Sequence, residues 1–133
     1  MKFKTKILVV STNTIVCKNI MSVLESEKYI VDTALSRDEA LLKETEDQYS
    51  IMIVDLTLLG ICGIELLKDV RKKNSNILII TITGCPSINA AAQLIELGAF
   101  DFIIKPFTPQ ELQDMIARAL RETQNKKIWF CRK

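Results

Sequence analysis

Five short runs of apolar residues, rich in isoleucine and valine, alternate with longer amphipathic stretches along the chain. Most of these runs lack the apolar–polar alternation of a strand that has one solvated face. Each run is therefore predicted to be a strand buried on both faces, which is typical of parallel sheets. The five runs span residues 6–10, 29–34, 50–55, 76–83 and 99–105.

The stretches between the apolar runs have helical periodicity, and two of them begin with strong capping signals. Ser36, with Glu39 three residues later, forms a capping box at the start of one helix. Thr108, Pro109 and Glu111 supply the cap, the first helical residue and the acidic third position of another helix. The predicted helices span residues 14–25, 36–47, 63–73, 86–98 and 108–124.

Strand and helix therefore alternate five times, and this (βα)5 order predicts an α/β fold with an open, doubly wound parallel sheet. Right-handed crossovers leave few topologies, and five strands fit the flavodoxin-like order 2-1-3-4-5. The run 29–34 is the most polar, as expected for an edge strand. We expect one domain over residues 1–124, with residues 125–133 as a C-terminal tail or the start of a linker.

The composition excludes several function classes. With 48% hydrophobic and 26% charged residues among 133, the chain is expected to be globular rather than disordered. A net charge of +2 is too small to indicate nucleic-acid binding. The chain has no histidine, the usual general base, and its four widely spaced cysteines indicate neither a zinc site nor a redox motif. We expect a cytoplasmic protein without membrane spans that is not an enzyme.

Polar residues stand at the ends of four of the predicted strands. They are Ser11 and Thr12 after the first strand, Asp55 at the end of the third, Thr83 at the end of the fourth and Lys105 at the end of the fifth. In this topology, ligands bind beyond the carboxyl ends of the first and third strands. An unpaired carboxylate is costly at the sheet centre, so Asp55 is predicted to be functional rather than a turn cap. A proline follows Lys105 and is compatible with a cis peptide bond there.

Three segments of the chain carry longer patterns. They read IMIVDLTLLGICGIELL at 51–67, ILIITITG at 77–84 and GAFDFIIKPFTPQELQDMIARAL at 98–120. Together they resemble the receiver domain of two-component response regulators. The last segment is the most specific, because G-A-x-D-F/Y-x-x-K-P-F is typical of that family. The resemblance extends over residues 6–122.

The resemblance implies a role for most of the polar residues at the strand ends. Asp55 would be the phosphoacceptor, and Lys105 would contact the phosphoryl group. Thr83 would be the switch hydroxyl and Phe102 the switch aromatic residue. Phosphorylation would then remodel the face formed by the fourth predicted helix, the fifth strand and the fifth helix.

The chain departs from the family pattern in the metal-binding half of the site. The family ends its first strand with two acidic residues that hold Mg²⁺, whereas Ser11 and Thr12 stand there in this chain. A hydroxyl is a weak neutral ligand, so Mg²⁺ binding is predicted to be weak or absent, with Asp55 and the backbone carbonyl of Thr57 as the ligands that remain. Lys105 is then expected to pair directly with Asp55.

Three hypotheses of function follow. The first is a phosphorelay receiver that takes its phosphoryl group from a histidine kinase or phosphotransfer protein and acts on an output domain or partner protein. The second is a pseudo-receiver that binds a partner protein without phosphorylation. The third is a flavodoxin-like cofactor binder, in which residues 11–14 hold a phosphate at a helix N-terminus. A homodimer is compatible with the first two, and no nucleic-acid or membrane partner is expected.

Overall fold

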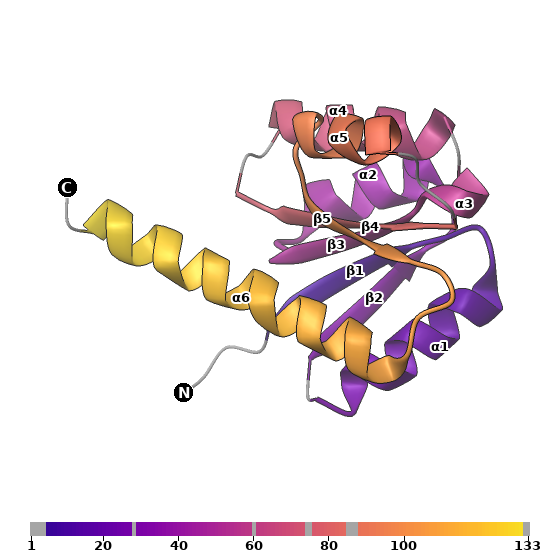
Figure 1. Cartoon of the computed structure of the whole chain (residues 1–133), viewed down its shortest axis with the longest axis horizontal. Coiled ribbons are helices and arrows are strands. Elements are labelled where there is room, and N and C mark those ends of the chain that lie inside the picture. The colour runs from indigo at the N-terminus through magenta and orange to yellow at the C-terminus, as the bar shows by residue number, and fades with distance from the viewer. Residues whose placement is uncertain (1–4, 28, 60, 74–75, 85–87, 132–133) are drawn as a thin grey trace.

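The central sheet has five parallel strands, and helices lie against both of its faces (Figure 1). The computed structural model describes residues 5–27, 29–59, 61–73, 76–84 and 88–131. The strands are β1 (Lys6–Val10), β2 (Ile30–Ala34), β3 (Ile51–Asp55), β4 (Leu78–Thr83) and β5 (Ala99–Ile104).

The strand order in the sheet is β2-β1-β3-β4-β5, and every neighbouring pair is parallel. This confirms the predicted doubly wound α/β fold with the order 2-1-3-4-5. The polar strand β2 lies at one edge of the sheet, as predicted, and β5 lies at the other. The chain changes direction across the sheet between β1 and β3, and in folds of this type ligands bind at the carboxyl ends of these strands.

The five predicted helices are all present, and most of their ends agree with the prediction to within two residues. The single turn α3 was not predicted, and α6 continues past residue 124, so the described part of the segment 125–133 is helical. Residue 86, the predicted start of the helix that corresponds to α5, lies outside the described residues. The helices are α1 (Thr14–Glu25), α2 (Arg37–Glu46), α3 (Leu56–Leu59), α4 (Ile61–Lys73), α5 (Ile88–Glu96) and α6 (Pro109–Cys131).

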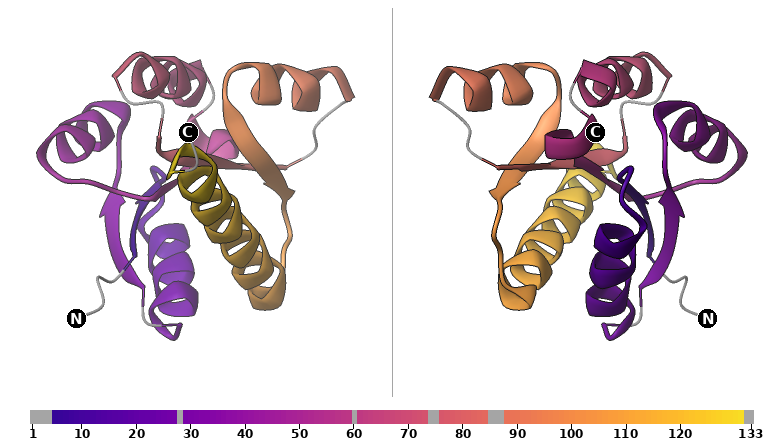
Figure 2. Two further views of the ribbon diagram at one scale, coloured as in Figure 1. Left: turned by 90° about the vertical axis from the view of Figure 1, so that its left-hand side faces the viewer. Right: turned by 90° about the vertical axis from the view of Figure 1, so that its right-hand side faces the viewer.

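Two hydrophobic cores lie on the two faces of the sheet. Helices α1 and α6 cover one face, and α2, α4 and α5 cover the other (Figure 2). Along β1, Ile7 and Val9 point into the first core, whereas Leu8 and Val10 point into the second. The central strands are therefore buried on both faces, which explains why their sequences are almost continuously apolar.

The N-terminal part of helix α6 packs on the sheet. Among the α6 side chains that the structure describes, Leu112, Ile116 and Ala119 are buried in the core that the helix shares with α1. The remainder of the helix projects past the end of the sheet (Figure 1). Among the described residues, no helix combines the length and the apolar composition that crossing a membrane requires.

Candidate functional site

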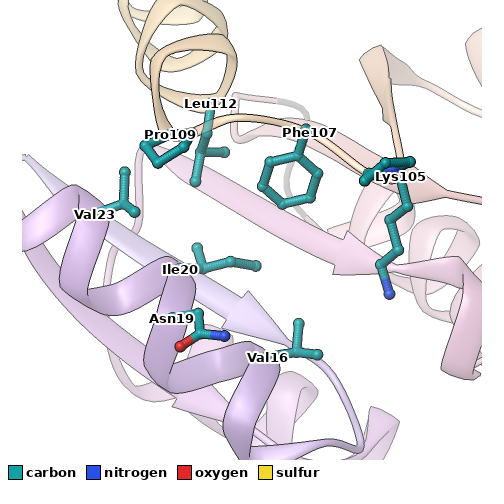
Figure 3. Close-up of a pocket in the computed structure, with 9 residues that line it drawn as sticks. Val16, Asn19, Ile20, Val23, Lys105, Phe107, Pro109 and Leu112 are labelled. Carbon is teal, nitrogen blue, oxygen red and sulfur yellow. The ribbon is translucent and has the colours of Figure 1, made fainter.

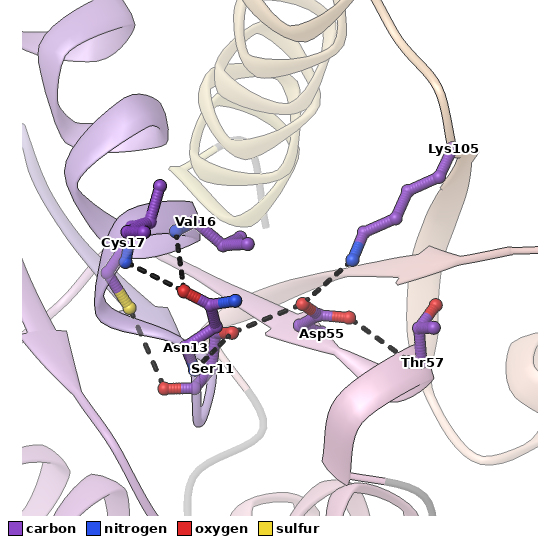
Figure 4. A network of polar contacts seen from close by, with 8 residues as sticks. Ser11, Asn13, Val16, Cys17, Asp55, Thr57 and Lys105 are labelled. Atoms are coloured by element: carbon purple, nitrogen blue, oxygen red, sulfur yellow. Dashed lines mark hydrogen bonds and ion pairs between the residues drawn. The ribbon is translucent and has the colours of Figure 1, made fainter.

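Three strands bring polar side chains to one point at the carboxyl edge of the sheet. Ser11 directly follows β1, Asp55 is the last residue of β3, and Lys105 directly follows β5. Thr57 lies next to them in the short helix α3. Their side chains and backbone groups form one hydrogen-bonded network, which is drawn in Figure 4.

The carboxylate of Asp55 is at the centre of this network. Asp55 is only 1% exposed, and it accepts three hydrogen bonds. Its Oδ2 accepts from the Ser11 hydroxyl at 3.2 Å and from the Lys105 ammonium at 3.1 Å. Its Oδ1 accepts from the backbone N–H of Thr57 at 3.1 Å. These donors, one of them charged, offset the cost of burying a carboxylate. The predicted pairing of Lys105 with Asp55 is thus confirmed.

Lys105 reaches Asp55 from two strands away. The backbone N–H of Lys105 donates to the carbonyl of Thr83 at 2.9 Å, which fixes the chain where it leaves the sheet. The peptide bond between Lys105 and Pro106 is cis, as the sequence allowed. The lysine side chain is 27% exposed, so its ammonium contacts Asp55 on one side and faces the surface of the molecule on the other.

Ser11 is fully buried and is itself held by Asn13. The backbone N–H of Asn13 donates to the Ser11 hydroxyl oxygen at 3.2 Å. The side chain of Asn13 caps α1, because its Oδ1 accepts from the backbone N–H groups of Ile15 and Val16. Sequence reasoning missed Asn13, although an asparagine directly before a helical stretch is a capping signal.

Cys17 of α1 is joined to this network through the backbone of Ser11. Its thiol donates to the backbone carbonyl of Ser11 at 3.7 Å. Burial raises the pKa of the Cys17 thiol, and the negative charge of Asp55 acts in the same direction, although the hydrogen bond to Ser11 partly opposes the rise. A buried thiol with a raised pKa is a poor nucleophile.

Among the described hydrogen bonds of this network, none involves the side chains of the remaining predicted site residues. Thr12 and Thr57 have exposed side chains, and Thr83 is half-buried at the end of β4. No hydrogen bond between described residues joins the side chain of Thr12 or Thr83 to Asp55. The half-buried ring of Phe102 packs into the core under α2, α4 and α5. The switch roles of Thr83 and Phe102 stay predictions.

The oxygen atoms of this site can be compared with the ligands that a divalent cation prefers. Mg²⁺ sites in proteins generally contain one or two carboxylates, with waters and phosphate oxygens as further ligands. Asp55 supplies one carboxylate, and both of its oxygens already accept hydrogen bonds. In the described part of the chain, no group of three or more acidic, cysteine or histidine side chains could hold a metal ion. Asp55 is thus the carboxylate that this hydrogen-bonded network contains.

An apolar groove of ≈ 590 Å³ opens beside the network, between α1 and the segment that joins β5 to α6 (Figure 3). Val16 and Ile20 of α1 line one side, and Phe107 and Leu112 line the other. Lys105 also lines the groove, so this residue is shared by the groove and the Asp55 site.

Comparison with known proteins assigns the chain to a family. A model of the response regulator receiver domain matches residues 7–117. The chain belongs to this family. Receiver domains generally bind Mg²⁺ at an acidic pocket, act with histidine kinases, and are generally not enzymes themselves.

Similar receiver domains occur in longer proteins and as separate solved structures. The transcriptional regulatory protein ResD of Bacillus subtilis strain 168 is 34% identical over 118 residues, which are 89% of this chain and 49% of ResD. The uncharacterized transcriptional regulatory protein YkoG of the same strain is 32% identical over 92% of this chain and 54% of its own length. The chain thus spans about half the length of these curated relatives.

A solved receiver domain protein from Methanospirillum hungatei JF-1, described as CheY-like, has the same fold. It aligns with a TM-score of 0.87 at 27% sequence identity, and the alignment covers 93% of this chain and 99% of that one. The structural similarity therefore extends over nearly the whole chain.

Proposed function

We propose that this receiver domain accepts a phosphoryl group on Asp55 in a two-component phosphorelay. The main support is the ion pair at the sheet edge, where the Lys105 ammonium lies 3.1 Å from the buried carboxylate. Phosphoryl transfer requires charge neutralisation of the moving group, and an ammonium at this place can supply it. The Thr83 hydroxyl, at the end of the neighbouring strand β4, would be a second contact of the phosphoryl group.

We further propose that phosphorylation acts on the face formed by α5, β5 and α6. Phe102 of β5 is half-buried, so its ring can move further into the core when Thr83 moves toward the phosphoryl group. An output domain or a partner protein would recognise the changed face, and a second copy of the chain is a further partner of the same kind. This domain itself would not contact nucleic acid.

The proposed phosphodonor is a histidine kinase or a phosphotransfer protein. The apolar groove beside Lys105 supports this, because a protein that docks there lies next to the acceptor carboxylate. Phe107 and Leu112 would contact apolar side chains of the donor protein. The proposed location is the cytoplasm, which is compatible with the free thiols of Cys17 and Cys62.

We propose that Mg²⁺ binds this site weakly or not at all before phosphorylation. The ligands that remain are the Asp55 carboxylate and the backbone carbonyl of Thr57. Ser11 and Thr12 offer neutral hydroxyls instead of carboxylates. In addition, the ammonium of Lys105 already neutralises the carboxylate that a cation would need.

Incubation with acetyl phosphate or phosphoramidate, followed by intact-mass measurement, tests the assignment of Asp55. One added phosphoryl group is expected on the wild-type protein and none on Asp55→Asn. Asp38→Asn makes the same chemical change on an exposed aspartate of α2, and it should still gain the phosphoryl group.

A second candidate function is supported by the ion pair itself. Because Lys105 neutralises Asp55 without metal, the site can stay in one arrangement, as expected of a pseudo-receiver that binds a partner without phosphorylation. If no adduct forms with either small donor or with a cognate kinase, the acceptor assignment is wrong and the pseudo-receiver remains. Nothing in the site favours the flavodoxin-like cofactor binder.

A further inference from the structure

The hydrogen bonds around Ser11 have a defined direction. A backbone N–H can only donate, so the Ser11 oxygen accepts from Asn13 at 3.2 Å. An ionised carboxylate can only accept, so the single hydroxyl proton of Ser11 points to Asp55 Oδ2 at 3.2 Å. Ser11 has no exposed surface, and water therefore does not compete for this hydroxyl.

The two oxygens of Asp55 consequently differ. Oδ2 accepts from both Ser11 and Lys105, so two hydrogens with positive partial charge surround it. A divalent cation that approached Oδ2 would be repelled by these hydrogens and by the full charge of the ammonium. Oδ1 accepts only the backbone N–H of Thr57. The lone pair that is free to attack an electrophile is therefore on Oδ1.

We propose that Ser11 is a positioning residue that makes phosphorylation of Asp55 independent of a divalent metal ion. This inference rests on the proposed acceptor role of Asp55. Ser11 holds Oδ2 in the sheet, and together with Lys105 it supplies the neutralisation that a bound cation would otherwise supply. Ser11 acts through Asp55 and does not contact the phosphodonor.

The reaction needs a donor with an activated phosphoryl group, which is an acyl phosphate or a phosphoramidate. A lone pair of Asp55 Oδ1 forms the new bond to phosphorus. The bond from phosphorus to the donor oxygen or nitrogen breaks, and the leaving group departs with that electron pair. A nitrogen leaving group also takes a proton from water. Ser11 and Lys105 keep their protons, and Oδ2 becomes the carbonyl oxygen of the acyl phosphate.

A cation-binding experiment tests the metal independence without any phosphorylation. Mn²⁺ is added to the ¹⁵N-labelled protein, and paramagnetic broadening of the backbone amide signals near Asp55 is measured. We expect no selective broadening in the wild type and clear broadening in the double variant Ser11→Asp/Thr12→Asp. The variant Ser22→Asp adds an exposed carboxylate at the far end of α1 and controls for the change of charge. Selective broadening around Asp55 in the wild type would overturn the proposal.

The positioning role is tested by phosphorylation kinetics with acetyl phosphate, in the presence of Mg²⁺ or of EDTA. The wild type should react at the same rate in both buffers. Ser11→Ala should lower the maximal rate about tenfold to a hundredfold with little change in the half-saturating donor concentration, because a hydrogen bond to a charged group is lost. Ser11→Thr should recover most of the rate, and Ser22→Ala on the same helix should match the wild type.

The possible failures are distinguishable. If the wild type forms the adduct only with Mg²⁺, or if Ser11→Ala reacts as fast as the wild type, the role of Ser11 is wrong and Asp55 remains the acceptor. If no variant forms an adduct with any donor, the proposed function itself fails, and the positioning role fails with it. The Mn²⁺ experiment still decides in that case whether the site with Ser11 and Thr12 excludes the cation.

Discussion

Two buried hydroxyl groups, those of Ser11 just after β1 and of Thr81 in β4, differ in their hydrogen bonding. The Ser11 hydroxyl accepts one hydrogen bond and donates another. The Thr81 hydroxyl in β4 is also buried, but it has no hydrogen-bond partner. Its register neighbours, Val54 in β3 and Phe102 in β5, both pack into the apolar core under α2, α4 and α5. Of these two hydroxyls, the one of Ser11 replaces its lost hydrogen bonds to water with hydrogen bonds to the protein, whereas the one of Thr81 does not.

Replacement of Thr81 by valine should therefore stabilise the protein. Valine has the same shape, and it removes a hydroxyl whose burial without a partner costs about 1–3 kcal/mol. We expect Thr81→Val to raise the free energy of unfolding by about 1 kcal/mol in urea titrations. Thr33→Val on the edge strand β2, where the side chain is half-buried, should change it less. A loss of stability in Thr81→Val would show that the hydroxyl is bonded in solution.

Gly98, between α5 and β5, tolerates a side chain less well than Gly84 does. Its φ is +102°, and a Cβ built on it would lie 2.4 Å from Nε of Arg71. The guanidinium of Arg71 lies there because it donates to the carbonyls of Gly98 and Ile77. This arginine thus joins the end of α4 to the segments that precede β4 and β5.

Gly98→Ala should lower the free energy of unfolding by at least about 2 kcal/mol, because it combines backbone strain with a steric clash. Gly84→Ala is the matched control. At Gly84 the nearest atom to an added Cβ is 3.7 Å away, which is an ordinary contact. Equal stabilities of the two variants in thermal unfolding would contradict the predicted strain at Gly98.

Among the helices and strands, the sequence predicted those that composition, periodicity and capping residues indicate. The isoleucine and valine runs indicated all five strands, and the capping residues Ser36 and Thr108 marked two helix starts that the structure has. The turn α3 was missed because four residues are too few to show periodicity. The end of α6 was placed too early, although no glycine or proline follows residue 124 to stop the helix.

One contact between elements makes stability depend on pH. Tyr49, which precedes β3, donates its phenolic hydrogen to Asp32 of β2 at 2.7 Å. Burial raises the pKa of the Tyr49 phenol, and the hydrogen bond to Asp32 and its charge raise it further. The folded protein therefore holds this proton more tightly than the unfolded chain does.

Because this pKa is raised by folding, its contribution to stability is fully present below about pH 10, the unperturbed tyrosine value, and is lost as the pH rises above it. The wild type should therefore lose stability relative to Tyr49→Phe as the pH rises from about 10 to about 12. Urea unfolding of both proteins across this range measures the difference. A difference that stays constant over the range would mean that the phenol titrates alike in both states.

At the scale of the whole molecule, the site is a product of topology. Ser11, Asp55 and Lys105 are far apart in sequence, and the sequence located them correctly because the carboxyl ends of parallel strands share one edge. The direction of the hydrogen bonds could not be predicted in the same way. It depends on how Asn13 caps α1 and on where Thr57 stands in a turn that the pattern did not reveal.

The strands of the sheet should also differ in how readily they unfold locally. Strands β1, β3 and β4 are central and almost fully buried, whereas the edge strands β2 and β5 have exposed residues such as Ile30 and Ile104. We expect backbone amides of the three central strands to exchange with deuterium most slowly under native conditions. Amides of β2 or β5 that exchange as slowly as those of β3 would contradict this expectation.

The length of α6 has a mechanical consequence. Among the α6 side chains that the structure describes, the last one fully buried in the core is that of Ala119, and the helix continues about 18 Å further to Cys131. A helix is stiff over this distance, so the projecting part moves as a rigid rod when the packed N-terminal part rotates. A tilt of about 10° of the packed part moves the C-terminal end of α6 by about 3 Å. Small rearrangements beside β5 are thus amplified at the tip of the helix.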